Sequence, residues 1–186
     1  MYSLTSDKKH ELLEIFKKIN VVEFGKFKLK DGSTSSVYID LRILPNFPKE
    51  FKLVTKIAVF YLKKTGLDKD FEGIISPPIA GIPLGLAIAL ELNKSFYLAR
   101  LVPKNHGTGK LIEGDVSGKK LLIVDDVITS GGSKTPLIEI IRDNNAQVTS
   151  IFVYVDRFHS NEEKRRYEEE NIVKIHALLS LVDLKQ

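Results

Sequence analysis

The spacing of apolar residues divides the chain into alternating helical and extended segments. Apolar positions recur at helical spacing over residues 6–19 and 49–65, which predicts two amphipathic helices. Short apolar runs near residues 74, 97, 122 and 151 have the length of buried strands, and helical segments lie between them. Strands that alternate with helices form βαβ units, so the pattern predicts an α/β fold with a mainly parallel central sheet flanked by helices.

Three further segments complete the predicted elements. Residues 22–42 predict a β-hairpin, since apolar and polar residues alternate on both sides of the turn signal Asp31-Gly32. Residues 160–170 are strongly charged and predict a solvated helix, and residues 172–181 predict a last strand with a short terminal turn. Residues 1–186 have the size of one domain, and no repeat or low-complexity linker divides them.

One stretch, residues 121–133, joins a predicted strand to groups that carry chemistry. Residues 121–124 are an apolar strand, and Asp125 and Asp126 stand at its carboxyl end. A turn of small residues, 129–133, then leads into a helix predicted over residues 133–145. Carboxylates at this point are suited to hold the hydroxyl groups of a ribose.

The small-residue turn after the acidic pair has the composition of a phosphate site. Its hydroxyls and the backbone N–H groups around Gly131 and Gly132 are able to donate to a phosphate, and the next helix adds the positive end of its dipole. The turn is neither a Walker loop nor a dinucleotide fingerprint, because it lacks the spacing of both. The alternative is an ordinary strand-to-helix turn with an exposed acidic pair. The complete stretch favours a sugar phosphate site.

Two other loops carry candidate chemistry. Residues 77–83, rich in Pro and Gly, follow a predicted strand, and open α/β sheets bind ligands at such positions; a tight packing turn is the alternative. Residues 102–114 contain three glycines and several basic side chains after the predicted strand 96–101, which predicts a mobile loop or a hairpin. A charged surface loop is the usual explanation for such a composition.

These motifs together resemble those of a known family. Residues 121–133 closely resemble the phosphoribosyl diphosphate signature of the type I phosphoribosyltransferases. Lys104-x-His106-Gly107, preceded by Arg100, closely matches the flexible catalytic loop of the orotate phosphoribosyltransferases. Residues 29–42 are similar to the hood of that family, the N-terminal segment that covers the base. Val155-Asp156-Arg157 matches the end of the family strand that lies beside the base.

The resemblance implies a fold and a reaction. The fold would be the type I phosphoribosyltransferase fold, with a small N-terminal hood formed over the base by residues 1–45 and part of the C-terminus. The reaction would be the Mg²⁺-dependent transfer of the phosphoribosyl group from 5-phosphoribosyl 1-diphosphate to orotate, giving orotidine 5′-phosphate and diphosphate in pyrimidine (UMP) biosynthesis. The substrate diphosphate and ribose hydroxyls, rather than dedicated protein ligands, would hold most of the Mg²⁺. A homodimer is implied, with the loop 102–114 reaching the partner's site.

The resemblance also assigns roles to individual residues. The catalytic residues would be Lys104, His106, Asp125 and Asp126. Orotate would be bound by Lys30, Tyr38, Ile39, Thr129 and Arg157, with the arginine on the orotate carboxylate. The phosphoribosyl diphosphate would be bound by Arg100, Lys104, His106, Asp125, Asp126, Val127, Ile128, Thr129, Ser130, Gly131, Gly132 and Ser133.

Two departures from the family pattern concern the diphosphate. Leu101 stands where the family loop commonly has a lysine, and the loop at residues 79–81 lacks the Tyr-Lys of some members. Each lost charged contact is worth about 1.5–3 kcal/mol, so weaker sugar diphosphate binding or slower chemistry is expected. Lys110 is the candidate that would substitute for the missing lysine.

Composition narrows the function classes further. The chain has no Cys, which excludes disulfides, thiolate catalysis and Cys-bound metals. The net charge of +4 is mild, no block of like charges appears, and no apolar run is long enough to span a bilayer. We therefore expect a cytoplasmic protein that binds anionic small molecules, with no nucleic acid and no membrane as partners.

Two alternatives to the orotate enzyme stay open. One is a catalytically weak or regulatory paralogue that binds the sugar diphosphate, for which Leu101 is the only support. The other is a transferase for another base. Arg157, Lys30 and the Lys104-x-His106-Gly107 loop argue against purines, whose sites do not need a carboxylate clamp.

Overall fold

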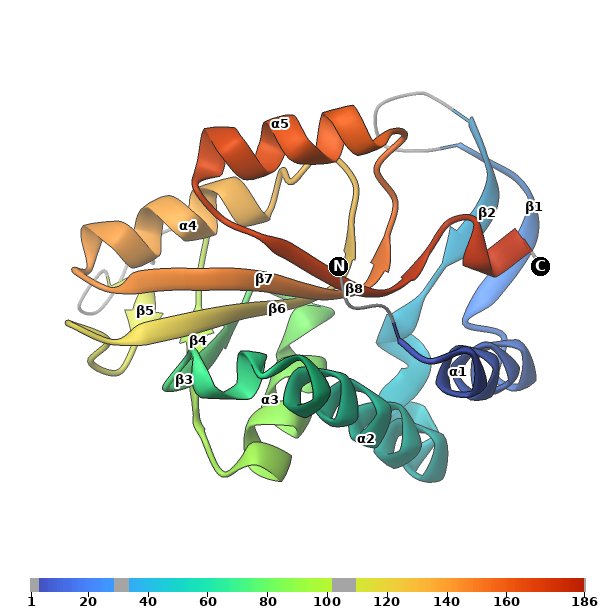
Figure 1. Cartoon of the computed structure of the whole chain (residues 1–186), viewed down its shortest axis with the longest axis horizontal. Helices are drawn as coiled ribbons and strands as arrows, with labels where there is room; N and C mark the ends of the chain where they lie inside the picture. The colour runs from blue at the N-terminus through green and yellow to red at the C-terminus, as the bar shows by residue number, and fades with distance from the viewer. Residues whose placement is uncertain (1–3, 29–33, 102–109, 186) are drawn as a thin grey trace.

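The computed structural model describes residues 4–28, 34–101 and 110–185, and it has an α/β architecture (Figure 1). The main sheet has the strand order β5-β4-β3-β6-β7-β8, and among these described strands only β5 runs antiparallel to its neighbour. Its strands are β3 (Gly73–Ser76), β4 (Ser95–Ala99), β5 (Ile112–Glu113), β6 (Lys120–Ile128), β7 (Gln147–Asp156) and β8 (Ile175–Ser180). The predicted fold class is confirmed.

Helices cover both faces of this sheet, with α2 and α3 on one side and α4 and α5 on the other (Figure 1). The α-helices are α1 (Ser6–Lys18), α2 (Pro48–Thr65), α3 (Gly81–Leu92), α4 (Lys134–Asp143) and α5 (Asn161–Asn171). Short 3₁₀ turns are η1 (Leu41–Asn46), η2 (Leu67–Lys69) and η3 (Asp183–Lys185). Among the described residues, no helix is both long and apolar enough to cross a membrane.

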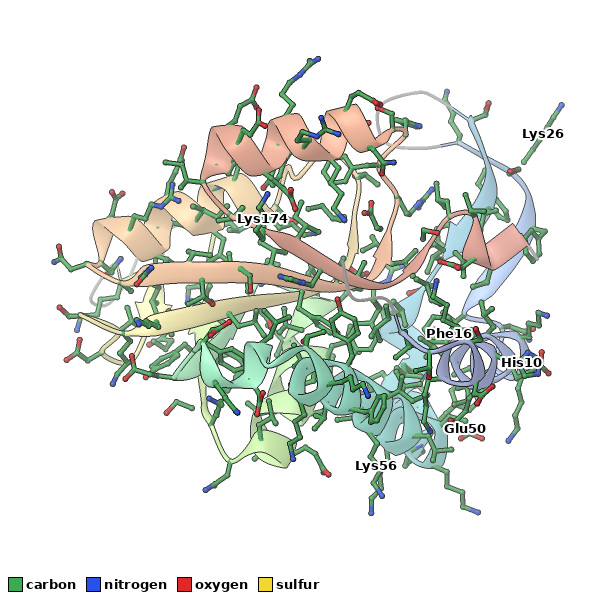
Figure 2. All side chains as sticks on the ribbon, viewed as in Figure 1. His10, Phe16, Lys26, Glu50, Lys56 and Lys174 are labelled. Carbon is green, nitrogen blue, oxygen red and sulfur yellow. The ribbon has the colours of Figure 1, made fainter. Side chains whose placement is uncertain are left out.

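Each face of the sheet has its own buried apolar cluster. On the α2 side, Phe16, Leu62 and Phe152 are fully buried in a cluster that runs from α1 across α2 to the sheet. Figure 2 shows Phe16 among the packed side chains beside α1, whereas Lys56 extends away from the exposed face of α2. The helical periodicity of the sequence therefore marked the buried faces of these helices correctly.

A second, two-stranded sheet stands beside the main one. Strands β1 (Val22–Lys28) and β2 (Thr34–Ile39) pair antiparallel, which confirms the predicted hairpin. In Figure 1 this hairpin lies near α1 and the C-terminal turn η3, and an ion pair of 2.8 Å joins Lys9 to Asp183. We call α1, β1 and β2 the hood. It shares the apolar cluster of α2, so it does not have a core of its own.

The sheet has a topological switch point between β3 and β6. Strand β4 follows β3 in the chain and lies on one side of this point, whereas β7 and β8 follow β6 and lie on the other side. The β3–β6 ladder stops at Ile75 and Ile123, whereas the β6–β7 ladder continues to Ile128 and Asp156. Beyond Val124 the β3-side edge of β6 is therefore unpaired, and this is where open α/β sheets bind ligands.

Three predicted elements need correction. The strand predicted over 121–124 extends to Ile128, because pairing with β7 continues past the two carboxylates. The helix predicted as solvated, α5, buries Tyr167 and Glu168, each 7% exposed. The last strand begins at Ile175, since Ile172 caps α5 in the left-handed conformation.

Candidate active site

The acidic pair lies at the carboxyl end of β6, inside the switch point. Asp125 is 5% exposed, and its Oδ1 accepts the N–H of Asp126 at 2.9 Å. Oδ1 of Asp126 in turn accepts the N–H of Val127 at 2.7 Å. Burial and the neighbouring charge of Asp125 raise the pKa of Asp126 to about 6. The two carboxylates therefore place partly solvated negative charge at this end of β6. Their oxygens are suited to accept hydrogen bonds from hydroxyl groups.

The turn after this pair is open to solvent and rich in donors. Thr129, Ser130 and Gly132 are exposed, and Gly131 adopts the left-handed conformation at φ +79°. Helix α4 begins directly after the turn, and its N-cap residue Ser133 makes no side-chain capping bond. The N–H groups of Lys134 and Thr135 donate to the carbonyl oxygen of Gly131 at 2.8 and 2.9 Å, and the positive end of the α4 dipole lies beside the turn. The phosphate-binding role of this turn stays a prediction.

A second loop lies against the acidic pair from the β3 side. Residues 77–80 connect β3 to α3, and the Pro78–Ile79 peptide bond is cis. A Cβ on Gly81 would lie 2.8 Å from the carbonyl oxygen of Val124 and 2.9 Å from Oδ1 of Asp125. Only glycine fits at such distances, so this loop can approach the carboxylates closely.

Arg157 stands beside the same turn, directly after β7. Its backbone N–H donates to the carbonyl oxygen of Ile128 at 2.9 Å, which fixes the residue next to the end of β6. Burial lowers the pKa of Arg157, and the charge of Asp126 opposes this shift. The neighbouring Asp156 makes its ion pair with Lys164 of α5 at 2.7 Å.

The hood brings Tyr38 into an ordered polar cluster. Arg42 donates to the Tyr38 hydroxyl at 2.8 Å and to both carboxylate oxygens of Asp40. The Tyr38 ring stacks on Phe27, with 5.3 Å between centroids. Ile39 is 7% exposed, and its side chain packs into the apolar cluster. A ligand would therefore contact the backbone of Ile39 and not its side chain. Lys30 lies outside the described residues, so its predicted role stays a prediction.

The predicted catalytic loop is described only at its base. Arg100 forms an ion pair of 3.2 Å with Glu113, and its N–H donates to the carbonyl oxygen of Leu111 at 2.8 Å. The base is therefore a hairpin, one of the two predicted possibilities. Leu101 packs against the second apolar cluster, and Lys110 is exposed. Lys104 and His106 lie outside the described residues.

Lys134 is a residue of this site that the sequence motifs did not reveal. It is 5% exposed and forms an ion pair with Oδ2 of Asp125. A lysine in the first turn of a helix opposes the helix dipole, and this unfavourable position was the available signal. Its nearness to the acidic pair depends on how α4 folds back over β6.

No group of three or more His, Asp or Glu side chains that would hold a metal ion occurs in 4–28, 34–101 or 110–185. The acidic pair offers carboxylate oxygens, the ligand type that Mg²⁺ prefers, but most of a coordination shell would have to come from a ligand's own oxygens. The carboxylates of Asp125 and Asp126 are compatible with a magnesium site whose other ligands are oxygens of the substrate.

A surface pocket lies at the opposite, amino edge of the sheet. It is lined by the first residues of β6 and β7, Lys120 and Gln147, and by Lys174 and His176. Figure 2 shows Lys174 near that edge, far along β7 and β8 from the hood. This pocket contains none of the predicted site residues.

Comparisons with known proteins identify the family of this chain. Residues 43–180 match the family described as the phosphoribosyl transferase domain. An orotate phosphoribosyltransferase of Pyrococcus abyssi is 36% identical over 177 residues, which is 95% of this chain and 94% of that protein. The chain belongs to the orotate phosphoribosyltransferase family. The predicted family is thereby confirmed.

Solved structures of the family share the fold. The orotate phosphoribosyltransferase of Aeropyrum pernix matches with a TM-score of 0.76 and 26% identity, over 93% of this chain and 96% of that chain. The UMP synthase of Leishmania donovani matches with a TM-score of 0.79 and 29% identity. That alignment covers 97% of this chain but only 37% of the longer synthase.

Proposed function

We propose that this protein transfers the phosphoribosyl group of 5-phosphoribosyl 1-diphosphate to orotate, forming orotidine 5′-phosphate and diphosphate for pyrimidine (UMP) biosynthesis. One observation carries the proposal. An acidic pair, an uncapped phosphate turn and Arg157 converge at the end of β6. Membership of the family supports the same reaction.

Each part of the sugar phosphate has a matching group in this site. The turn 129–133 binds the 5′-phosphate through its hydroxyls, its N–H groups and the start of α4. Asp125 and Asp126 accept the ribose hydroxyls at the carboxyl end of β6. The loop 77–80 faces the diphosphate from the β3 side, because Gly81 allows its close approach to Asp125.

Arg157 supplies the recognition of orotate. A guanidinium group binds a carboxylate with two parallel hydrogen bonds, and partial burial strengthens both. Tyr38 and Lys30 approach the ring from the hood, with Tyr38 held by Arg42. Since the hood shares a core with α2, Tyr38 keeps a fixed position relative to the sheet.

The chemistry requires charge stabilisation more than proton transfer. The C1–O bond to the diphosphate breaks with its electron pair on the leaving group, and a ring nitrogen of orotate forms the new bond to C1. Asp125 and Asp126 stabilise the positive charge that develops on the sugar. The ring N–H of orotate loses its proton as the bond to C1 forms, and the departing diphosphate or solvent takes that proton, so no strong base from the protein is required. His106 is the candidate proton donor to the leaving group.

Magnesium belongs to the proposal, held mainly by the diphosphate and the ribose hydroxyls that Asp125 and Asp126 accept. When bound, it supplies positive charge that neutralises the diphosphate. Lys104, His106 and Arg100 are proposed to add cationic groups when the loop closes. Removal of Mg²⁺ with EDTA should abolish turnover, and added Mg²⁺ should restore it.

A homodimer is part of the same proposal. Leu86 and Leu90 lie one turn apart on α3 and are 40% and 73% exposed, and Leu98 of β4 is 43% exposed. Leu98 shares a strand face with Phe96, whose ring lies against Gly85 of α3. The exposed leucines therefore belong to one side of the sheet, and Leu98 is next to the base of the loop 102–114. Such a patch suits a partner subunit.

Loss of orotate absorbance in the presence of the sugar diphosphate and Mg²⁺ tests this function. Uracil, hypoxanthine and adenine run in parallel as competing bases. Consumption of orotate alone supports the proposal, and consumption of another base instead of orotate would contradict it. No turnover with retained sugar diphosphate binding would favour the regulatory paralogue, for which Leu101, partly buried against the second apolar cluster, is the supporting observation. The cytoplasmic location stays a prediction, which cell fractionation tests.

A further inference from the structure

The ammonium group of Lys134 occupies a buried site with three acceptors. It forms an ion pair with Oδ2 of Asp125, and the two side chains are only 6% and 7% exposed. It also donates to the carbonyl oxygen of Val127 at 2.6 Å and to Oγ of Ser133 at 3.1 Å. An ammonium group has three N–H bonds, so each has an acceptor here. A buried cation is tolerated only in such an arrangement.

The acceptors of Lys134 belong to both ends of the phosphate turn. Asp125 and Val127 lie on β6, before the turn, and Ser133 is its last residue. One ammonium group therefore connects the strand that carries the acidic pair to the start of α4. Rotation of the Asp125 carboxylate is restricted, because one oxygen is held by Lys134 and the other by the N–H of Asp126.

The same ammonium group balances the charge of the acidic pair. Asp126 is flanked by Asp125 on its own strand, by Lys134 from α4 and by Arg157 from the end of β7. The loop 77–80 on the β3 side brings no ionisable side chain. Lys134 is in direct contact with Asp125, and its charge opposes the rise in the pKa of Asp126.

We propose that Lys134 is a positioning residue of the active site: it orients Asp125 and balances the charge of the acidic pair, so that the pair accepts the ribose hydroxyls of the sugar diphosphate. This inference rests on the proposed function for the identity of the ligand. It differs from a purely structural role, in which Lys134 would stabilise the fold without affecting ligand binding.

The test compares Lys134→Met with a matched variant, Lys94→Met. Lys94 is also a partly buried lysine, bonded to the carbonyl oxygen of Phe71 and placed over its ring at 4.4 Å, but it lies at the amino edge of the sheet. Binding of 5-phosphoribosyl 1-diphosphate with Mg²⁺ is measured by calorimetry from pH 5 to 9. Turnover with orotate is measured on the same samples.

Lys134→Met should weaken sugar diphosphate binding about tenfold or more, and the acid limb of the binding profile should move to higher pH. The KM for orotate should change little, and Lys94→Met should match the wild type. In an Asp125→Asn background, Lys134→Met should have a much smaller effect, because Lys134 acts through Asp125. If Lys134→Met does not fold, Lys134→Gln replaces it, since Gln retains a donor without the charge.

A lower melting temperature with unchanged binding and pH profile would overturn the inference and leave a structural role. Equal losses from Lys134→Met in the wild-type and the Asp125→Asn backgrounds would also overturn it. The proposed function fails separately, if the wild type binds the sugar diphosphate but does not consume orotate.

Discussion

The ring of Tyr167 on α5 occupies the space that a β-carbon on Gly131 would need. An ideal Cβ at Gly131 would overlap the ring and lie 2.7 Å from the Tyr167 hydroxyl oxygen. That hydroxyl is 3.1 Å from Oγ1 of Thr135, in the first turn of α4. The Tyr167 ring therefore packs directly against Gly131 of the phosphate turn. A residue far away in the sequence thus determines the shape of the turn.

Gly131→Ala should disrupt the turn for two reasons. Alanine is strained at φ +79°, and its methyl group would collide with Tyr167. We expect a loss of roughly 1–3 kcal/mol in the free energy of unfolding and a marked rise in the KM for the sugar diphosphate. Urea unfolding and steady-state kinetics measure both. Gly132→Ala is the matched control for the unfolding measurement, because nothing lies within 4 Å of its Cβ position.

Asp126→Asn should change how stability depends on pH. The pKa of Asp126 is about 6 in the folded protein and near 3.8 in the unfolded chain, so the folded state binds more protons between these values. The free energy of unfolding therefore falls as the pH rises through this window, by at most about 3 kcal/mol.

The Asp126→Asn variant should lack this fall and should be more stable than the wild type at pH 7.5, while losing most of its activity. Urea unfolding at pH 4.5 and 7.5 measures the difference. Asp143→Asn, at an exposed carboxylate of α4, provides the comparison. An identical pH dependence in the wild type and the Asp126→Asn variant would refute the assignment of the shift to Asp126.

Arg157→Lys tests the clamp on the orotate carboxylate. Lysine keeps the positive charge but cannot make two parallel hydrogen bonds to a carboxylate. The KM for orotate should therefore rise about 10- to 100-fold, which corresponds to a loss of roughly 1.5–3 kcal/mol in binding free energy. The KM for the sugar diphosphate should change much less. Arg142→Lys, at an arginine that donates to the carbonyl oxygen of Asn171, should leave both constants unchanged. Equal rises in both constants would show a general disturbance of the site.

Leu90→Glu tests the proposed dimer surface. A charge in the α3–β4 patch should shift the protein toward monomers in sedimentation equilibrium and lower its activity, if the loop 102–114 completes the partner's site. Val182→Glu is the control, since Val182 is similarly exposed, at 68%, but lies near the C-terminal turn η3. A wild type that sediments as a monomer at assay concentrations would contradict the dimer.

The sequence was sufficient for the features that are local. Asp125, Asp126 and the turn 129–133 are contiguous, and alternating helices and strands define the sheet, so both were predicted. The missed features depend on contacts between distant segments. The end of β6 was predicted too early, because two carboxylates interrupt the apolar run while β7 continues the ladder to Ile128.

Tyr167 and Lys134 illustrate the same limit at the level of side chains. Tyr167 sits in a highly charged helix, and only the packing of α5 over the turn shows that it is buried. Lys134 has the sequence context of a surface cation, and it is buried against Asp125 only because α4 folds back onto β6. The unfavourable position of Lys134 in the first turn of α4 is the one local signal in the sequence for these two contacts.

The most direct test of the proposed reaction follows the phosphorus atoms. In ³¹P NMR, 5-phosphoribosyl 1-diphosphate is incubated with the protein, Mg²⁺ and orotate, with Asp126→Asn as the reference. The account predicts release of one diphosphate for each orotate converted to orotidine 5′-phosphate, with little or none from the variant. A sugar diphosphate that binds but stays intact, or that is cleaved equally without orotate, would contradict it.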